Sequence, residues 1–147
     1  MQQSEVDAIR AFNRYYTDII GLLDKYILDS PYSLPEARVL YELYHREGIL
    51  AGEIIALLSI DKGYLSRILD QFSKSRLIMK SRSAVDGRSV HLSLTAKGRT
   101  AYESLNRASD AQIRGIFSPL PEKERVQLLQ HMTAIKKILA RPEGEQP

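Results

Sequence analysis

Apolar residues recur every three or four positions along most of the chain, a spacing that predicts amphipathic helices. The first such segment covers residues 4–28, and its apolar face includes Val6, Ile9, Phe12, Tyr16, Ile19 and Leu23. We predict one long helix there, ended before Pro31, because the residue before a proline disfavours the helical backbone. The same periodicity predicts further helices over residues 33–47, 52–58, 62–74, 96–117 and 121–140.

Residues that favour helix starts stand where several of these segments begin. Ser33 precedes Glu36 by three positions, the spacing of a capping box, and Pro35 falls in the first turn, where its missing N–H costs nothing. Asp61 and Thr95 stand in the capping positions of the helices predicted at 62–74 and 96–117.

The middle of the chain predicts a helix-turn-helix followed by a hairpin. Only Ser59-Ile60 separates helices 52–58 and 62–74, so the two must cross steeply. The period then changes to two, which predicts strands at 77–81 and 89–94 joined by a polar loop with an Asp-Gly turn signal. The predicted fold class is mainly α with a small β-wing, a winged helix-turn-helix with long N- and C-terminal helices.

Composition narrows the function classes. The 147 residues are 44% hydrophobic and 27% charged, which suits one folded domain and excludes a disordered chain. The absence of Cys excludes disulfides, thiolate metal sites and thiol redox sensing. No apolar run is long enough to cross a bilayer, and the charged first fifteen residues exclude a signal peptide. We therefore expect a soluble, cytoplasmic protein with no membrane partner.

Positive charge is concentrated in one segment. Residues 61–99 carry nine Lys or Arg against three Asp, whereas the rest of the chain carries 12 basic and 15 acidic residues. Such asymmetry is expected where a polyanion is held locally. A solvated charged surface would produce the same pattern, so charge alone leaves both interpretations open.

The order of elements and three strings resemble the MarR-type winged-helix transcriptional regulators. The strings are Asp61-Lys62-Gly63-Tyr64-Leu65-Ser66-Arg67-Ile68-Leu69, Asp86-Gly87-Arg88 and Leu92-Ser93-Leu94-Thr95-Ala96-Lys97-Gly98. The resemblance covers nearly the whole chain. It extends to the subset in which this domain precedes a GNAT-type acetyltransferase domain, so the chain is either a stand-alone relative or a fragment that ends near the linker.

The resemblance implies a homodimer. Residues 1–140 would form one domain, with dimerisation helices at 4–30 and 96–140, a winged lobe at 33–94 and a disordered tail at 141–147. The wide apolar faces of the outer helices agree with this, since monomers rarely leave such patches exposed. The alternative is that these faces pack within their own chain.

Helical spacing divides the segment 62–74 into two faces. Leu65, Ile68, Leu69 and Phe72 share one side, so the side chains that point outward are those of Lys62, Ser66, Arg67 and Asp70. Arg67 is suited to a bidentate contact with guanine, and Gly63 permits a close backbone approach. For Tyr64, contact with DNA and packing at the lobe's edge are equally open.

In the wing, the resemblance implies that Arg88 enters the minor groove with Asp86 fixing its guanidinium. The alternative for Asp86 is that it only serves the turn. Lys74, Lys80 and Arg76 would contact phosphates or serve solubility. The expected partner is double-stranded DNA with a near-palindromic operator. The residues that we expect to contact DNA are Lys62, Gly63, Tyr64, Ser66, Arg67, Lys74, Lys80, Arg82, Asp86, Gly87 and Arg88.

Three positions depart from the family pattern. Asp70 stands where these regulators often carry a basic residue, Ser59 replaces the usual Gly of the turn, and Leu50-Ala51-Gly52 lacks a hydroxyl cap.

Tyrosines suggest a ligand. Eight Tyr against three Phe is an excess, and the family binds small phenolic or anionic effectors in a cleft beside the lobe. Tyr16, Tyr41 and Tyr44 are the candidates, with a tyrosine-covered helical interface as the alternative. We expect His91 to be a surface residue, and we expect no metal site, cofactor or catalytic centre.

The sequence thus predicts a sequence-specific DNA-binding transcriptional regulator, a repressor released by a small-molecule effector. Two alternatives remain: a regulatory or targeting domain of an acetyltransferase, and a winged helix used for protein–protein contacts.

Overall fold

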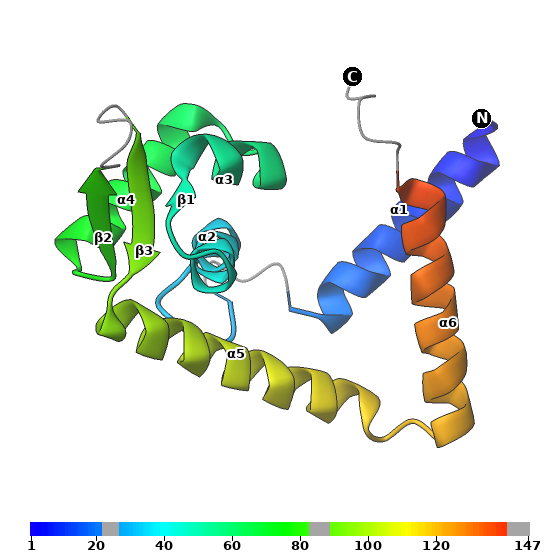
Figure 1. Ribbon diagram of the computed structural model, residues 1–147. Helices are drawn as coiled ribbons and strands as arrows, with labels where there is room; N and C mark the ends of the chain where they lie inside the picture. Colours follow the sequence, from blue (N-terminus) through cyan, green and yellow to red (C-terminus); the bar gives the residue numbers. More distant parts are fainter. Residues whose placement is uncertain (22–26, 83–88, 141–147) are drawn as a thin grey trace. The chain divides into compact units, whose positions relative to one another are not determined.

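Helices dominate the computed structural model, which describes residues 1–21, 27–82 and 89–140 (Figure 1). The elements follow the order α1 (Gln3–Ile19), α2 (Leu34–His45), β1 (Ile49–Leu50), α3 (Ala51–Leu58), α4 (Lys62–Lys74), β2 (Ile78–Arg82), β3 (Val90–Leu94), α5 (Ala96–Phe117) and α6 (Glu122–Leu139). This order confirms the predicted mainly α fold with a small β-wing. The tail expected at 141–147 lies outside the described residues.

The first helix is shorter than predicted. Periodicity favoured a helix over residues 4–28, but α1 ends at Ile19, and Gly21 follows with a φ of 62°. Glycine adopts this left-handed conformation at little cost and commonly ends helices. Leu28 and Asp29 also have positive φ, so the chain turns there instead of continuing as a helix. Residues 22–26 of the expected helix lie outside the described part.

Helix α2 begins as predicted. The Ser33 N–H donates to Glu36 Oε2 at 2.7 Å, and the Ser33 hydroxyl lies 2.8 Å from the same oxygen. The neighbouring Tyr32 ring packs edge-on against Phe72 of α4, with ring centroids 6.3 Å apart. Burial, together with the charge of Glu36, raises the pKa of the Tyr32 hydroxyl above its usual value.

The turn between α3 and α4 is held in a strained conformation. Ser59 has φ 48° and ψ 40°, the left-handed region that glycine occupies more readily. The start of α3 lacks a hydroxyl cap. There Glu53 Oε2 accepts a hydrogen bond from the Leu50 N–H at 2.8 Å. Of these two departures, the missing hydroxyl cap is partly offset by Glu53, whereas Ser59 keeps a strained left-handed conformation.

Replacing Ser59 with glycine is expected to raise the free energy of unfolding by about 0.5–1 kcal/mol, because glycine relieves the left-handed strain but adds freedom to the unfolded chain. Urea unfolding followed by circular dichroism measures this change. Ser75, at the C-terminal end of α4 with φ −80°, provides the matched control. Ser75→Gly should give no gain, and an equal gain there would contradict the explanation.

The sheet has three strands in the order β1-β3-β2, all antiparallel. The sequence predicted only the hairpin of β2 and β3, so β1 is a correction: Ile49 and Leu50 pair with Leu92 and His91. Figure 1 shows β1 as a short arrow beside β3, directly before α3. A two-residue strand carries no periodicity of its own, and its partner lies more than forty positions away in the chain.

Side chains of β3 hold the loop before β1. The Gly48 N–H donates to Ser93 Oγ at 3.1 Å, and His91 Nδ1 lies 2.7 Å from the Gly48 carbonyl oxygen. A carbonyl only accepts, so Nδ1 carries the proton. The expectation that His91 is a surface residue is therefore wrong, because this half-buried ring fixes the loop.

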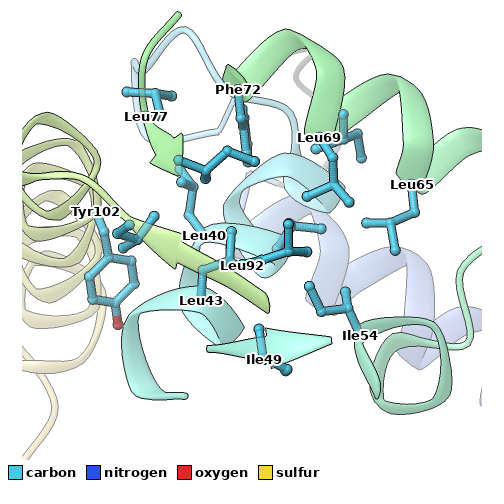
Figure 2. Close-up of a cluster of buried hydrophobic side chains, with 14 of the residues drawn as sticks. Leu40, Leu43, Ile49, Ile54, Leu65, Leu69, Phe72, Leu77, Leu92 and Tyr102 are labelled. Atoms are coloured by element: carbon cyan, nitrogen blue, oxygen red, sulfur yellow. The ribbon is translucent and has the colours of Figure 1, made fainter. Parts of the chain in front are cut away.

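The core lies inside the lobe formed by α2, α3, α4 and the sheet. Figure 2 shows side chains from these elements converging, with Tyr102 reaching in from α5. The four residues predicted to form the inner face of α4 are all buried: Leu65, Ile68, Leu69 and Phe72. The chain forms two compact units: Met1–Ser109, which holds this core, and Asp110–Pro147, which holds the end of α5 and all of α6.

Candidate nucleic-acid interface

One face of α4 is anchored in the core and the opposite face is open to solvent. Asp61 Oδ1 accepts the Tyr64 N–H at 2.8 Å, which confirms the predicted cap and fixes the first turn of the helix. Lys62, Gly63, Ser66 and Arg67 are all exposed, as helical spacing predicted. The helix therefore presents polar and cationic groups from a rigid support.

Gly63 has a local structural role besides openness. A Cβ at this position would lie 3.3 Å from Asp61 Oδ1, tighter than ordinary contact. A side chain there would press on the carboxylate that caps the helix. Glycine thus protects the cap and leaves the backbone of the first turn uncovered.

Arg67 and Tyr64 form a pair on the open face. The Arg67 guanidinium carbon lies 5.5 Å from the centroid of the Tyr64 ring, within the range of a cation–π contact. This contact limits the positions of a long flexible side chain while its N–H donors remain free to reach outward. Tyr64 also lines a groove next to the turn between α3 and α4. The same ring therefore contacts Arg67 and borders this groove.

The wing contributes fewer free cations than its sequence suggests. Lys80 Nζ on β2 lies 3.7 Å from Asp70 Oδ1 on α4, and both side chains are largely exposed. Exposed pairs of this kind contribute little to stability, but they orient both groups. Lys74 and Arg82 are exposed at the ends of α4 and β2. Asp86, Gly87 and Arg88 lie outside the described residues.

A cavity of about 420 Å³ opens beside α2 and α5. Its lining comprises Ile27, Leu28, Leu34, Ala37, Arg38, Tyr41, Tyr102, Leu105, Asn106 and Ser109. We name it the effector cavity. Rings and aliphatic chains make up most of its wall, with a guanidinium, a carboxamide and hydroxyls between them, a composition typical of small-molecule sites.

The three candidate tyrosines have different places. Tyr41 lines the effector cavity, whereas Tyr44 stacks on Tyr102 with ring centroids 4.3 Å apart. Tyr16 stacks on Phe12 within α1 at 5.8 Å. Sequence reasoning did not single out Arg38, Tyr102 or Asn106. Tyr102 lies between Gly98 and Leu105 on one face of α5. This helical spacing predicts that the face is buried, but it does not predict a cavity.

Neither a metal-binding cluster nor a membrane-spanning helix occurs within the described ranges. No group of three or more His, Asp or Glu side chains there is placed to hold a metal ion. No helix in that part of the chain is both long and apolar enough to cross a membrane.

Comparison with known proteins gives three kinds of match. The sequence model of the MarR family matches residues 30–89. The HTH-type transcriptional regulator MgrA of Staphylococcus aureus is 34% identical over 104 residues, which cover 71% of this chain and 67% of that protein.

Solved structures share the fold at low sequence identity. Streptococcus pneumoniae FabT, determined in complex with DNA, matches with a TM-score of 0.76 at 19% identity, covering 92% of this chain and 96% of that one. The structure of Bordetella bronchiseptica BpsR, whose DNA binding is regulated by 6-hydroxynicotinic acid, matches with a TM-score of 0.68 at 19% identity. The match covers 88% of this chain and 98% of that one.

Proposed function

The chain belongs to the MarR family of transcriptional regulators, and from that premise we propose that it is a repressor that binds double-stranded DNA as a homodimer. A small-molecule effector releases it. It carries out no catalysis, and it works in the cytoplasm, where its promoters are.

The observation that carries the proposal is the open face of α4. Arg67, Ser66 and Lys62 extend from a helix whose opposite side is fixed in the core. A helix of this width enters the major groove, where Arg67 reads guanine and Lys62 contacts the backbone. Tyr64 and Gly63 complete this surface.

The wing lies next to α4 and adds contacts with the backbone and the minor groove. Lys74 at the end of α4, and Lys80 and Arg82 on β2, are exposed cations. We further propose that Arg88 enters the minor groove, with Asp86 and Gly87 next to it in the sequence, because a narrow minor groove concentrates negative potential that favours arginine.

Two outer helices support the dimer. Neither α1 nor α6 contains a buried residue among those described, although both carry apolar side chains. A second copy that covers these faces removes the apolar surface from water. Two recognition helices about 34 Å apart then read a near-palindrome.

The effector cavity is the proposed site for the releasing molecule. It lies between α2, which belongs to the lobe, and α5, which leads out of it. A ligand there acts on the position of α2 relative to α5. Tyr41 contributes a ring and a hydroxyl to that site, and Tyr44 supports it through Tyr102.

Replacing Arg67 with alanine tests the DNA-binding surface. The bidentate contact is worth about 1–3 kcal/mol, so affinity for duplexes selected by the wild-type protein should fall roughly tenfold or more, with a smaller loss on scrambled DNA. Fluorescence anisotropy at fixed salt measures both values.

Arg107→Ala is the matched control, because Arg107 is an exposed arginine of α5 away from α4. Its affinity should equal that of the wild type. Unchanged affinity in Arg67→Ala, or a wild-type protein that selects no DNA, would contradict the proposed function.

A further inference from the structure

One carboxylate lies on the open face of α4. Asp70 is the only acidic residue in this helix, and its side chain is 63% exposed. Leu65, Leu69 and Phe72 point from the same helix into the core (Figure 2). At 3.6 residues per turn, the position of Asp70 is nearly opposite this buried face. The carboxylate therefore belongs to the surface that we propose to face DNA.

Helical spacing places Asp70 among the residues that we assign to DNA contact. Around the helix axis it falls between Ser66 and Arg67, which precede it by four and three positions. Along the axis it stands about 4.5 Å beyond Arg67, a separation of about one to two base-pair steps. When Arg67 contacts one base, Asp70 consequently lies over a neighbouring base pair.

The Asp70 carboxylate is oriented on one side and open on the other. Its Oδ1 lies 3.7 Å from Lys80 Nζ on β2, and the carboxylate makes no other ion pair or hydrogen bond with any residue that the structure describes. An ionised carboxylate accepts hydrogen bonds at both oxygens, so Oδ2 is open to a donor. Lys80 also places a positive charge beside the carboxylate, which offsets part of its repulsion from DNA phosphates.

We propose that Asp70 is a specificity-determining residue of the DNA interface, and that its open oxygen accepts a hydrogen bond from the N4 amino group of a cytosine. In the major groove, guanine presents acceptors, thymine an acceptor and a methyl group, and adenine a donor next to its N7 acceptor, which a carboxylate cannot use. Every base other than cytosine thus leaves the carboxylate poorly paired, so the residue selects by penalising the wrong sequence. The inference rests on the proposed function, because it names a base that the same helix reads.

In vitro selection from randomised duplexes tests this assignment. The base pair whose preference is lost in Arg67→Ala marks the guanine assigned to Arg67. Within about two base pairs of it, sites selected by the wild type should contain a C·G pair whose replacement lowers affinity roughly tenfold. Asp70→Asn keeps the size of the side chain but presents a donor and an acceptor, which match adenine. Its selected sites should carry A·T at that position, with the guanine unchanged.

Fluorescence anisotropy at fixed salt on the C·G and A·T duplexes measures the change of preference. Asp110→Asn is the matched control, because Asp110 is an exposed aspartate in the second compact unit of the chain, and it should keep the wild-type preference. A wild type without the C·G preference, or an Asp70→Asn protein that retains it, would overturn the inference while the guanine lost in Arg67→Ala still supported the proposed function. A wild type that selects no DNA would overturn both.

Discussion

Replacing Gly98 with alanine is expected to lower the free energy of unfolding by about 3 kcal/mol or more, because the added methyl group has no space. A Cβ there would overlap the carbonyl oxygen of Leu77 and lie 3.0 Å from Leu94 Cδ2. That carbonyl is held in place by the Thr95 N–H at 2.9 Å, so it cannot simply turn away. Relief of the clash requires α5 to move away from the sheet.

Gly115, in the same helix, is the matched control. Nothing lies within 4 Å of a Cβ built there, so Gly115→Ala should raise the free energy of unfolding by about 0.5–1 kcal/mol through helix propensity. Urea unfolding at one protein concentration measures both variants. A loss for Gly98→Ala no larger than about 0.5 kcal/mol would show that α5 adjusts freely and would contradict the packing argument.

The elements most reliably predicted from the sequence are those that local signals define. Helix α4 is the clearest case: Asp61 starts it, and its four inner residues recur at helical spacing, so both ends and the buried face agree with the prediction. Thr95 likewise starts α5, and its hydroxyl accepts the Gly98 N–H at 3.1 Å. In these cases short-range chemistry and long-range packing favour the same conformation.

What the sequence did not predict depends on partners distant in the chain. Strand β1 exists because β3 pairs with it, and His91 is half-buried because Gly48 folds against it. The end of α1 was missed for a different reason. Apolar periodicity continued past Gly21, and periodicity alone does not show that a glycine will adopt a positive φ.

The candidate site divides in the same way. Exposure of Lys62, Ser66 and Arg67 followed from the helical pattern. The effector cavity did not, because its walls come from α2 and α5, more than sixty positions apart, and meet only through packing. Arg38 gave no signal, since a single arginine on the polar side of a helix usually indicates solvent exposure.

Replacing Leu129 with glutamate is expected to raise the dimer dissociation constant at least about 100-fold, or about 2.7 kcal/mol. Leu129 is 63% exposed and borders a groove of about 430 Å³ along α6, together with Val126 and Thr133. If a second copy covers this face, the substitution places an unpaired carboxylate in an apolar interface. A two-fold dimer carries it twice, so the cost is doubled. Sedimentation velocity over a concentration series measures the association.

Gln127→Glu is the matched control, because it introduces the same charge two residues away on the polar side of α6, where Gln127 lies 3.4 Å from His131 Nε2. Its dimer should associate like the wild type. Circular dichroism verifies that both variants remain helical. A monomeric Leu129→Glu protein should also bind DNA far more weakly, because a single lobe loses the gain in effective concentration that the second lobe provides. If Leu129→Glu remains dimeric at low micromolar concentration, this face of α6 is not part of the interface, which must then be formed by other helices such as α1.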